Sequence, residues 1–145
     1  MTADCVTLAF PARPEYLLLA RLALTGVARA GGAEEDVLAD LRLAVTEAAA
    51  NVVRHAYADG DGDIMLAFTL TGSGRLEVIV EDDGPGFDEA DVASWEPTDL
   101  GEDGMGLAII RAVADEVEIG SRRDSSGTRL RFSRALSEPR QAGIT

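Results

Sequence analysis

The sequence Thr46-Glu47-Ala48-Ala49-Ala50-Asn51-Val52-Val53-Arg54-His55 lies within a long stretch, from about Glu34 to Tyr57, in which apolar residues recur at helical spacing. With about 100° of rotation per residue, one side of this helix is lined by apolar side chains: Leu38, Leu41, Val45, Ala48, Ala49, Val52 and Ala56. The opposite side gathers the polar side chains of Glu47, Asn51, Arg54 and His55. We therefore expect one face of the helix to pack in the core and the other to be available for chemistry.

The polar face of this helix joins a carboxylate to a carboxamide. Glu47 and Asn51 stand four positions apart, so their side chains can reach a common volume on the helix surface. A carboxylate can act as a general base, and an amide oxygen is a suitable ligand for a hard cation such as Mg²⁺. Taken alone, the segment favours the simpler interpretation of a solvated polar face. The rest of the chain has to distinguish the two interpretations.

The length and hydropathy of the chain predict one globular domain. A chain of 145 residues that is 46% hydrophobic can bury a sizeable core. We expect the domain to span residues 1–134 and residues 135–145 to be a disordered tail, because no apolar period continues after Ser133. No apolar run approaches the roughly 18 residues of a membrane span, and the first residues lack the basic segment of a signal peptide. These features predict a cytoplasmic protein without membrane contact.

The charge balance restricts the classes of ligand. Acidic residues number 26 against 13 basic ones, which argues against nucleic acid as a direct ligand. Every basic residue is arginine, so Schiff-base chemistry and a lysine-based phosphate loop are excluded. Phosphate contacts would then come from arginine, backbone N–H groups or a metal. At a net charge of −13, a polyphosphate ligand needs a cation, for which Mg²⁺ is the natural candidate.

Helix and strand signals flank the central helix on both sides. Further helices are expected at residues 15–30 and 107–117, and strands at residues 5–10, 64–71, 76–80, 117–119 and 128–132. Cys5, in the first strand, is expected to be a small buried residue. Leu18 and Leu22 form a second apolar ridge on the helix 15–30. Two interpretations of this ridge stay open: it packs under a loop, or it contacts a partner or a second copy of the chain.

Two glycine motifs flank a weakly structured acidic segment, residues 88–103. After the strand 76–80, Asp82-x-Gly84-x-Gly86 places a carboxylate beside residues without a β-carbon, which suits a flat adenine ring whose amino group donates to Asp82. Gly104-x-Gly106 directly precedes the helix 107–117, where unpaired N–H groups suit phosphates. Each motif alone is a weak signal, and their order along the chain is the stronger one.

In this order and spacing, the motifs resemble those of the Bergerat-fold (GHKL) ATP-binding superfamily over residues 5–133: Glu47/Asn51, Asp82-x-Gly84-x-Gly86, Gly104-Met105-Gly106-Leu107 and Gly127-Thr128. The string Thr-Glu-Ala-x-x-Asn-x-x-x-His-Ala-Tyr is most similar to the anti-sigma-factor serine kinases, which regulate bacterial transcription by partner switching. The resemblance implies a two-layer α/β sandwich, with helices on one face of a mixed, mainly antiparallel sheet. ATP would lie between the helices and the sheet.

The resemblance also implies roles for the polar side chains of the central helix. Asn51 would coordinate the Mg²⁺ that bridges the phosphates, and Glu47 would be the general base for the attacking hydroxyl. Arg54 occupies a position that often carries a phosphate-contacting base in related histidine kinases. His55 matches a histidine common in the serine kinases, and we expect it to pack rather than to catalyse.

The remaining motif residues would hold the nucleotide. Asp82 would accept the adenine amino group, with Thr128 close by through a shared water, while Gly84 and Gly86 keep that wall thin. The phosphates would be wrapped by the backbone at Gly104, Met105, Gly106 and Leu107. Residues 88–103 would form the lid.

Two functions remain open at this point. The resemblance implies a serine/threonine protein kinase that transfers the γ-phosphate of ATP to a STAS-type anti-sigma-factor antagonist and alternately binds a sigma factor. A homodimer is compatible with the Leu18/Leu22 ridge. Glu47 favours this kinase over a sensor histidine kinase, in which an acidic base is unusual at that position. The alternative is a nucleotide-binding anti-sigma module with little or no turnover.

Overall fold

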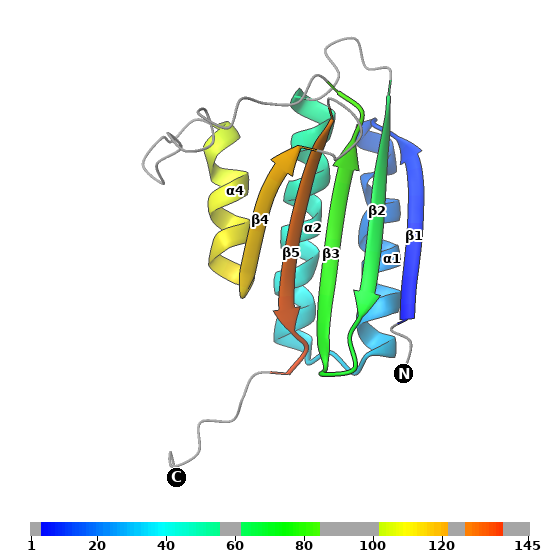
Figure 1. Cartoon of the computed structure of the whole chain (residues 1–145), viewed down its shortest axis with the longest axis vertical. Coiled ribbons are helices and arrows are strands. Elements are labelled where there is room, and N and C mark those ends of the chain that lie inside the picture. The colour runs from blue at the N-terminus through cyan, green and yellow to red at the C-terminus, as the bar shows by residue number, and fades with distance from the viewer. Residues whose placement is uncertain (1–3, 56–61, 85–101, 122–126, 138–145) are drawn as a thin grey trace.

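The computed structural model describes residues 4–55, 62–84, 102–121 and 127–137, and only the backbone of His55 and residues 102–105. The strands are β1 (Asp4–Pro11), β2 (Asp63–Leu70), β3 (Arg75–Asp82), β4 (Glu116–Ser121) and β5 (Thr128–Ala135). The helices are the short 3-10 helix η1 (Pro14–Tyr16) and the α-helices α1 (Leu17–Ala30), α2 (Glu35–His55) and α4 (Glu102–Val113). The α-helices lie on one face of the sheet (Figure 1), which confirms the predicted two-layer α/β sandwich.

The sheet brings the last strand of the chain into its interior. The strand order is β1-β2-β3-β5-β4, so β5 lies between β3 and β4. All four pairings among the described strands are antiparallel. The sheet was predicted to be mixed and mainly antiparallel, and the described strands include no parallel pair. Because Glu81 pairs with Arg129, the beginning of β5 lies beside the end of β3. Two segments that are far apart in the sequence therefore meet at one end of the sheet.

The apolar side of α2 forms the centre of the core. The predicted core residues of α2 that the structure describes are buried, none more than 7% exposed: Leu38, Leu41, Val45, Ala48, Ala49 and Val52. Ala56 lies outside the described residues. The core also takes the inward residues of alternating strands, such as Phe68, Val78 and Phe132. Burial of these large side chains, each worth about 1.5–3 kcal/mol, fixes the orientation of α2.

The structure corrects two predicted boundaries near the C-terminal half. The helix predicted at residues 107–117 begins at Glu102 and ends at Val113. Val117 was predicted both to end this helix and to begin the strand 117–119, and it lies in β4, where it pairs with Phe132. At the end of the domain, β5 continues to Ala135, and Leu136 is only 3% exposed. Leu136 N donates to Gly74 O at 3.0 Å, so the fold extends past the predicted boundary at residue 134.

Surface positions on β1 and α1 also bear on the predictions. Cys5 is exposed rather than buried, because it lies on the side of β1 away from the helices, where its sulfur accepts from Thr69 Oγ1 at 3.4 Å. No part of the chain that the structure describes covers the Leu18/Leu22 ridge, and these side chains are 55% and 58% exposed. Within the described residues, no helix is both long enough and apolar enough to cross a membrane.

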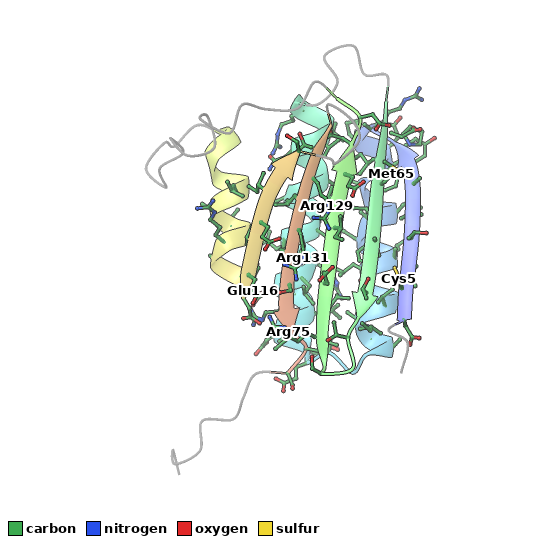
Figure 2. The ribbon with its side chains drawn as sticks, viewed as in Figure 1. Cys5, Met65, Arg75, Glu116, Arg129 and Arg131 are labelled. Carbon is green, nitrogen blue, oxygen red and sulfur yellow. The ribbon has the colours of Figure 1, made fainter. Side chains whose placement is uncertain are left out.

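Paired charges cover the face of the sheet opposite to the helices (Figure 2). Arg131 Nη2 lies 2.8 Å from Glu77 Oε2, and its Nη1 lies 3.8 Å from carboxylate oxygens of both Glu116 and Glu118. The hydrogen bond to Glu77 raises the pKa of Arg131 above its ordinary value. Arg131 is thus the shared cation of three carboxylates, and it holds β3, β4 and β5 together on this face.

We expect Arg131→Met to lower the free energy of unfolding by about 1–2 kcal/mol, because three carboxylates lose their shared cation. The loss should shrink in about 1 M salt, where screening weakens the remaining repulsion. Denaturant unfolding at low and high salt measures both effects. The matched control is Arg111→Met on the exposed side of α4. Equal effects of the two substitutions would contradict the proposed importance of the Arg131 network.

Candidate functional site

Four segments meet at one end of the molecule, at the top of Figure 1. They are the C-terminal part of α2, the beginning of α4, the end of β3 and the beginning of β5. These segments carry Glu47 and Asn51, Gly106, Asp82 and Thr128, respectively. The topology therefore brings together the motifs whose convergence the sequence predicts.

Asp82 is a buried, hydrogen-bonded carboxylate at this end of the molecule. It is the last residue of β3, and it is only 3% exposed. Its Oδ1 accepts from Gly84 N at 2.9 Å and from Thr128 N at 3.3 Å. The backbone of two neighbouring segments therefore fixes the orientation of the carboxylate, as expected for a buried acceptor. Asp82, Gly84 and Thr128 lie together as predicted, whereas Gly86 lies outside the described residues.

The polar face of α2 points toward α4 at Gly106. A β-carbon placed on Gly106 would lie 3.1 Å from Asn51 Oδ1 and 3.2 Å from Glu47 Oε2. Such distances are tighter than ordinary van der Waals contact, so only glycine lets α4 pass here without displacing either side chain. Gly106 is predicted to wrap the phosphates, and its close approach to Glu47 and Asn51 was not predicted, since the glycine itself is the only signal for it in the sequence.

The placement of the second glycine motif corrects the prediction. Gly104, Met105 and Gly106 lie inside α4 rather than in a turn before it. Two glycines in a helix cost about 1 kcal/mol each relative to alanine, and the burial of Leu107 and Ile110 against the rest of the protein offsets this cost. Because Leu107 is 5% exposed, its side chain packs inward. Residues 88–101 of the predicted lid lie outside the described residues.

Arg54 joins the two candidate functional side chains of α2. Its Nη2 donates to Asn51 Oδ1 at 3.0 Å and lies 4.0 Å from Glu47 Oε2. The side chain of Glu47 is 25% exposed, so solvent or a ligand can still reach the carboxylate. The side chain of His55 lies outside the described residues.

The donor chemistry of this site fits Mg²⁺ in combination with a nucleotide. Asn51 offers an amide oxygen, a hard ligand of the kind that Mg²⁺ prefers, and the neighbouring carboxylate of Glu47 adds negative charge beside it. In the part of the chain that the structure describes, no group of three or more His, Cys, Asp or Glu residues could hold a metal ion. The remaining ligands would have to come from phosphate oxygens and water, as is usual for Mg²⁺ with nucleotides.

The sequence matches the family of histidine kinase-like ATPase domains over residues 10–134. The fold and the site thus define a domain of this class, which confirms the predicted use of ATP. The serine-protein kinase RsbW of Bacillus subtilis strain 168 is 36% identical over 147 aligned residues, covering 95% of this chain and 89% of the relative. RsbW of Listeria monocytogenes is 39% identical, covering 80% of this chain and 79% of the relative. The chain belongs to the RsbW family of serine-protein kinases, which confirms the resemblance predicted from its motifs.

Solved structures share the fold. The RsbU and RsbW domains of a Mycobacterium tuberculosis protein match with a TM-score of 0.68 at 24% identity, over 94% of this chain and 33% of that chain. The chain thus spans a third of that larger protein. The SiaB–SiaC complex from Pseudomonas aeruginosa matches with a TM-score of 0.66 at 16% identity, over 88% of each chain. These matches support the arrangement of helices and sheet described above.

We expect Gly106→Ala to separate stability from ligand binding. Alanine should leave the free energy of unfolding unchanged or raise it by up to about 1 kcal/mol, because glycine is unfavourable within a helix. Its β-carbon should nevertheless displace Glu47 or Asn51 and weaken Mg²⁺-dependent nucleotide binding on the order of 10-fold, which corresponds to about 1.4 kcal/mol. Calorimetric titration with ADP and Mg²⁺ measures this loss.

The matched control for this prediction is Gly26→Ala. Gly26 lies within α1, and a β-carbon there would meet nothing within 4 Å. The control should change stability in a similar way and leave nucleotide binding intact. Wild-type affinity in Gly106→Ala would show that the close approach of α4 does not matter for the ligand.

We expect Asp82→Asn to weaken ADP binding on the order of 10- to 100-fold, because the motif resemblance implies that this carboxylate accepts the adenine amino group. Calorimetric titration of both proteins with ADP provides the measurement. Asp83→Asn is the matched control, since Asp83 is the next residue and is exposed. An unchanged affinity in Asp82→Asn would mean that the adenine binds elsewhere.

Proposed function

We propose that this protein is an ATP- and Mg²⁺-dependent serine/threonine kinase that phosphorylates a STAS-type anti-sigma-factor antagonist. The observation that carries the proposal is the position of Glu47, an accessible carboxylate beside Asn51 on the polar face of α2. The RsbW relatives are named serine-protein kinases, which supports transfer to a hydroxyl group. A carboxylate that faces the phosphates is suited to receive a proton from such a hydroxyl.

In this mechanism each end of the site has a separate task. Asp82 and the backbone around Gly84 and Thr128 bind and orient the adenine. Asn51 would hold the metal, and Mg²⁺ when bound would supply positive charge to the phosphates. The oxygen of the substrate hydroxyl bonds to the γ-phosphorus while Glu47 accepts the hydroxyl proton. The bond from that phosphorus to the β-phosphate oxygen breaks, and ADP leaves. Orientation of the hydroxyl and the γ-phosphate accounts for most of the acceleration in such reactions.

Protein partners are part of the proposed function. The exposed Leu18/Leu22 ridge on α1 supports a docking surface for a protein, and a sigma factor or a second copy of the chain would suit its apolar character. The net charge of −13 would accelerate encounter with the basic, DNA-binding regions of a sigma factor at low salt. Alternate binding of sigma factor and antagonist would then link phosphorylation to transcription.

We expect Glu47→Gln to reduce phosphoryl transfer by a factor on the order of 10² to 10⁴, while ADP affinity stays within a few-fold of wild type. The assay combines γ-labelled ATP, Mg²⁺ and candidate STAS-domain proteins, and it follows the label on the acceptor protein. The glutamine keeps the shape of the side chain, so the loss reports the missing base.

Glu35→Gln is the matched control for this assay. Glu35 lies in the first turn of the same helix, and its carboxylate is largely exposed. The control should transfer phosphate at the wild-type rate. Equal activity of Glu47→Gln and Glu35→Gln would remove Glu47 from the mechanism. Nucleotide binding without transfer to any acceptor would favour the alternative, a nucleotide-binding anti-sigma module.

A further inference from the structure

Arg54 binds both side chains that the proposed function assigns to the reaction. Its guanidinium donates to Asn51 Oδ1 at 3.0 Å and lies 4.0 Å from Glu47 Oε2. The three residues occupy successive turns of one helix face, so the backbone of α2 sets this arrangement. The helix itself therefore places the three side chains within reach of one another.

The oxygen that Arg54 engages is also the oxygen proposed to bind the metal. A guanidinium has only donors, and it carries a permanent positive charge. A metal ion at Asn51 Oδ1 would stand next to this charge and would be repelled by it. Movement of the guanidinium away from Asn51 would relieve this repulsion and so favour metal binding there.

We propose that Arg54 is a positioning residue whose guanidinium occupies the place of the metal's charge between Glu47 and Asn51 and competes with Mg²⁺ for Asn51 Oδ1. This inference rests on the proposed function, because it takes the metal site from it. A displaced guanidinium finds a new anionic partner only when the nucleotide phosphates are present. The metal and the nucleotide therefore bind together, and Arg54 supplies part of the charge compensation when nucleotide binds without metal.

This role differs measurably from that of a simple phosphate contact. An arginine that only touches phosphate contributes equally with and without the metal, so its removal weakens both forms of binding by the same factor. An arginine that competes with the metal contributes most when the metal is absent. Its removal therefore increases the gain in nucleotide affinity that Mg²⁺ produces.

The test compares Arg54→Met with wild type, using a fluorescent ADP analogue titrated in EDTA and in saturating Mg²⁺. Methionine keeps the length of the side chain and a high helix propensity, and the position is 40% exposed, so the fold should be retained. The ratio of the dissociation constant in EDTA to that in Mg²⁺ should rise about 10-fold in Arg54→Met. Arg54→Lys keeps the charge without the planar fork and should give an intermediate ratio.

Two controls define the range of the measurement. Asn51→Ala removes the oxygen for which the metal and the guanidinium compete, so its ratio should approach 1. Arg42→Met changes an arginine on the same helix that donates to Thr25 Oγ1 instead, and it should keep the wild-type ratio. A second readout is the side-chain amide resonance of Asn51 in the nucleotide-free protein, which should shift in Arg54→Met and remain in place in Arg42→Met.

The outcomes separate this inference from the proposed function. Equal weakening of binding in EDTA and in Mg²⁺, or an unmoved Asn51 resonance, would overturn the role of Arg54 and leave the kinase intact. Failure of the wild-type protein to bind ADP under either condition would overturn the proposed function itself. A steeper dependence on Mg²⁺ in Arg54→Met alone supports the competition.

Discussion

The apolar side of α2 has to be buried against the sheet and its neighbouring helices, and this requirement determines where its polar side points. Once residues such as Leu41, Val45 and Val52 are buried, helical geometry leaves Glu47 and Asn51 facing α4. Dense packing of the core allows little rotation of the helix about its axis. The positions of the carboxylate and the carboxamide are therefore consequences of core packing rather than of local hydrogen bonds.

The sequence predicts those parts of the site that depend on a single periodic element. The two faces of α2 follow from its helical period, whereas only the family resemblance, and no periodic element, implies that Thr128 lies close to Asp82. The beginning of α4 could not be predicted in this way, because two glycines indicate a turn in any local reading. The burial of Leu107 and Ile110 stabilises a helix that includes both glycines, and this burial depends on tertiary packing. Cys5 and Leu136 were misplaced for a similar reason, since their burial depends on which elements cover them.

The contacts of Arg54 and Gly106 show a second limit of sequence reasoning. Helical spacing places Arg54 one turn after Asn51, which allows either a contact with a bound phosphate or a contact back to the helix. The structure has the second arrangement, in which the guanidinium reaches Asn51 Oδ1. Gly106 similarly satisfies two demands, because a residue without a side chain suits both a phosphate and the close passage of α4 over α2. Residues such as Arg54 and Gly106 are compatible with both a phosphate contact and a contact within the protein, so the sequence alone does not show which contact forms.

In an acidic protein that binds a polyphosphate, positive side chains are needed both to pair with carboxylates and to compensate the phosphates. Arg131 is held by a 2.8 Å bond to Glu77 and by two further carboxylates, and its side chain is only 21% exposed. Such a group is fixed, and it stabilises the sheet. Arg54 has one hydrogen bond to a neutral amide, a carboxylate at 4.0 Å and a side chain that is 40% exposed. Weak anchoring of this kind costs little to release, so Arg54 is better suited than Arg131 to exchange its partners for phosphate.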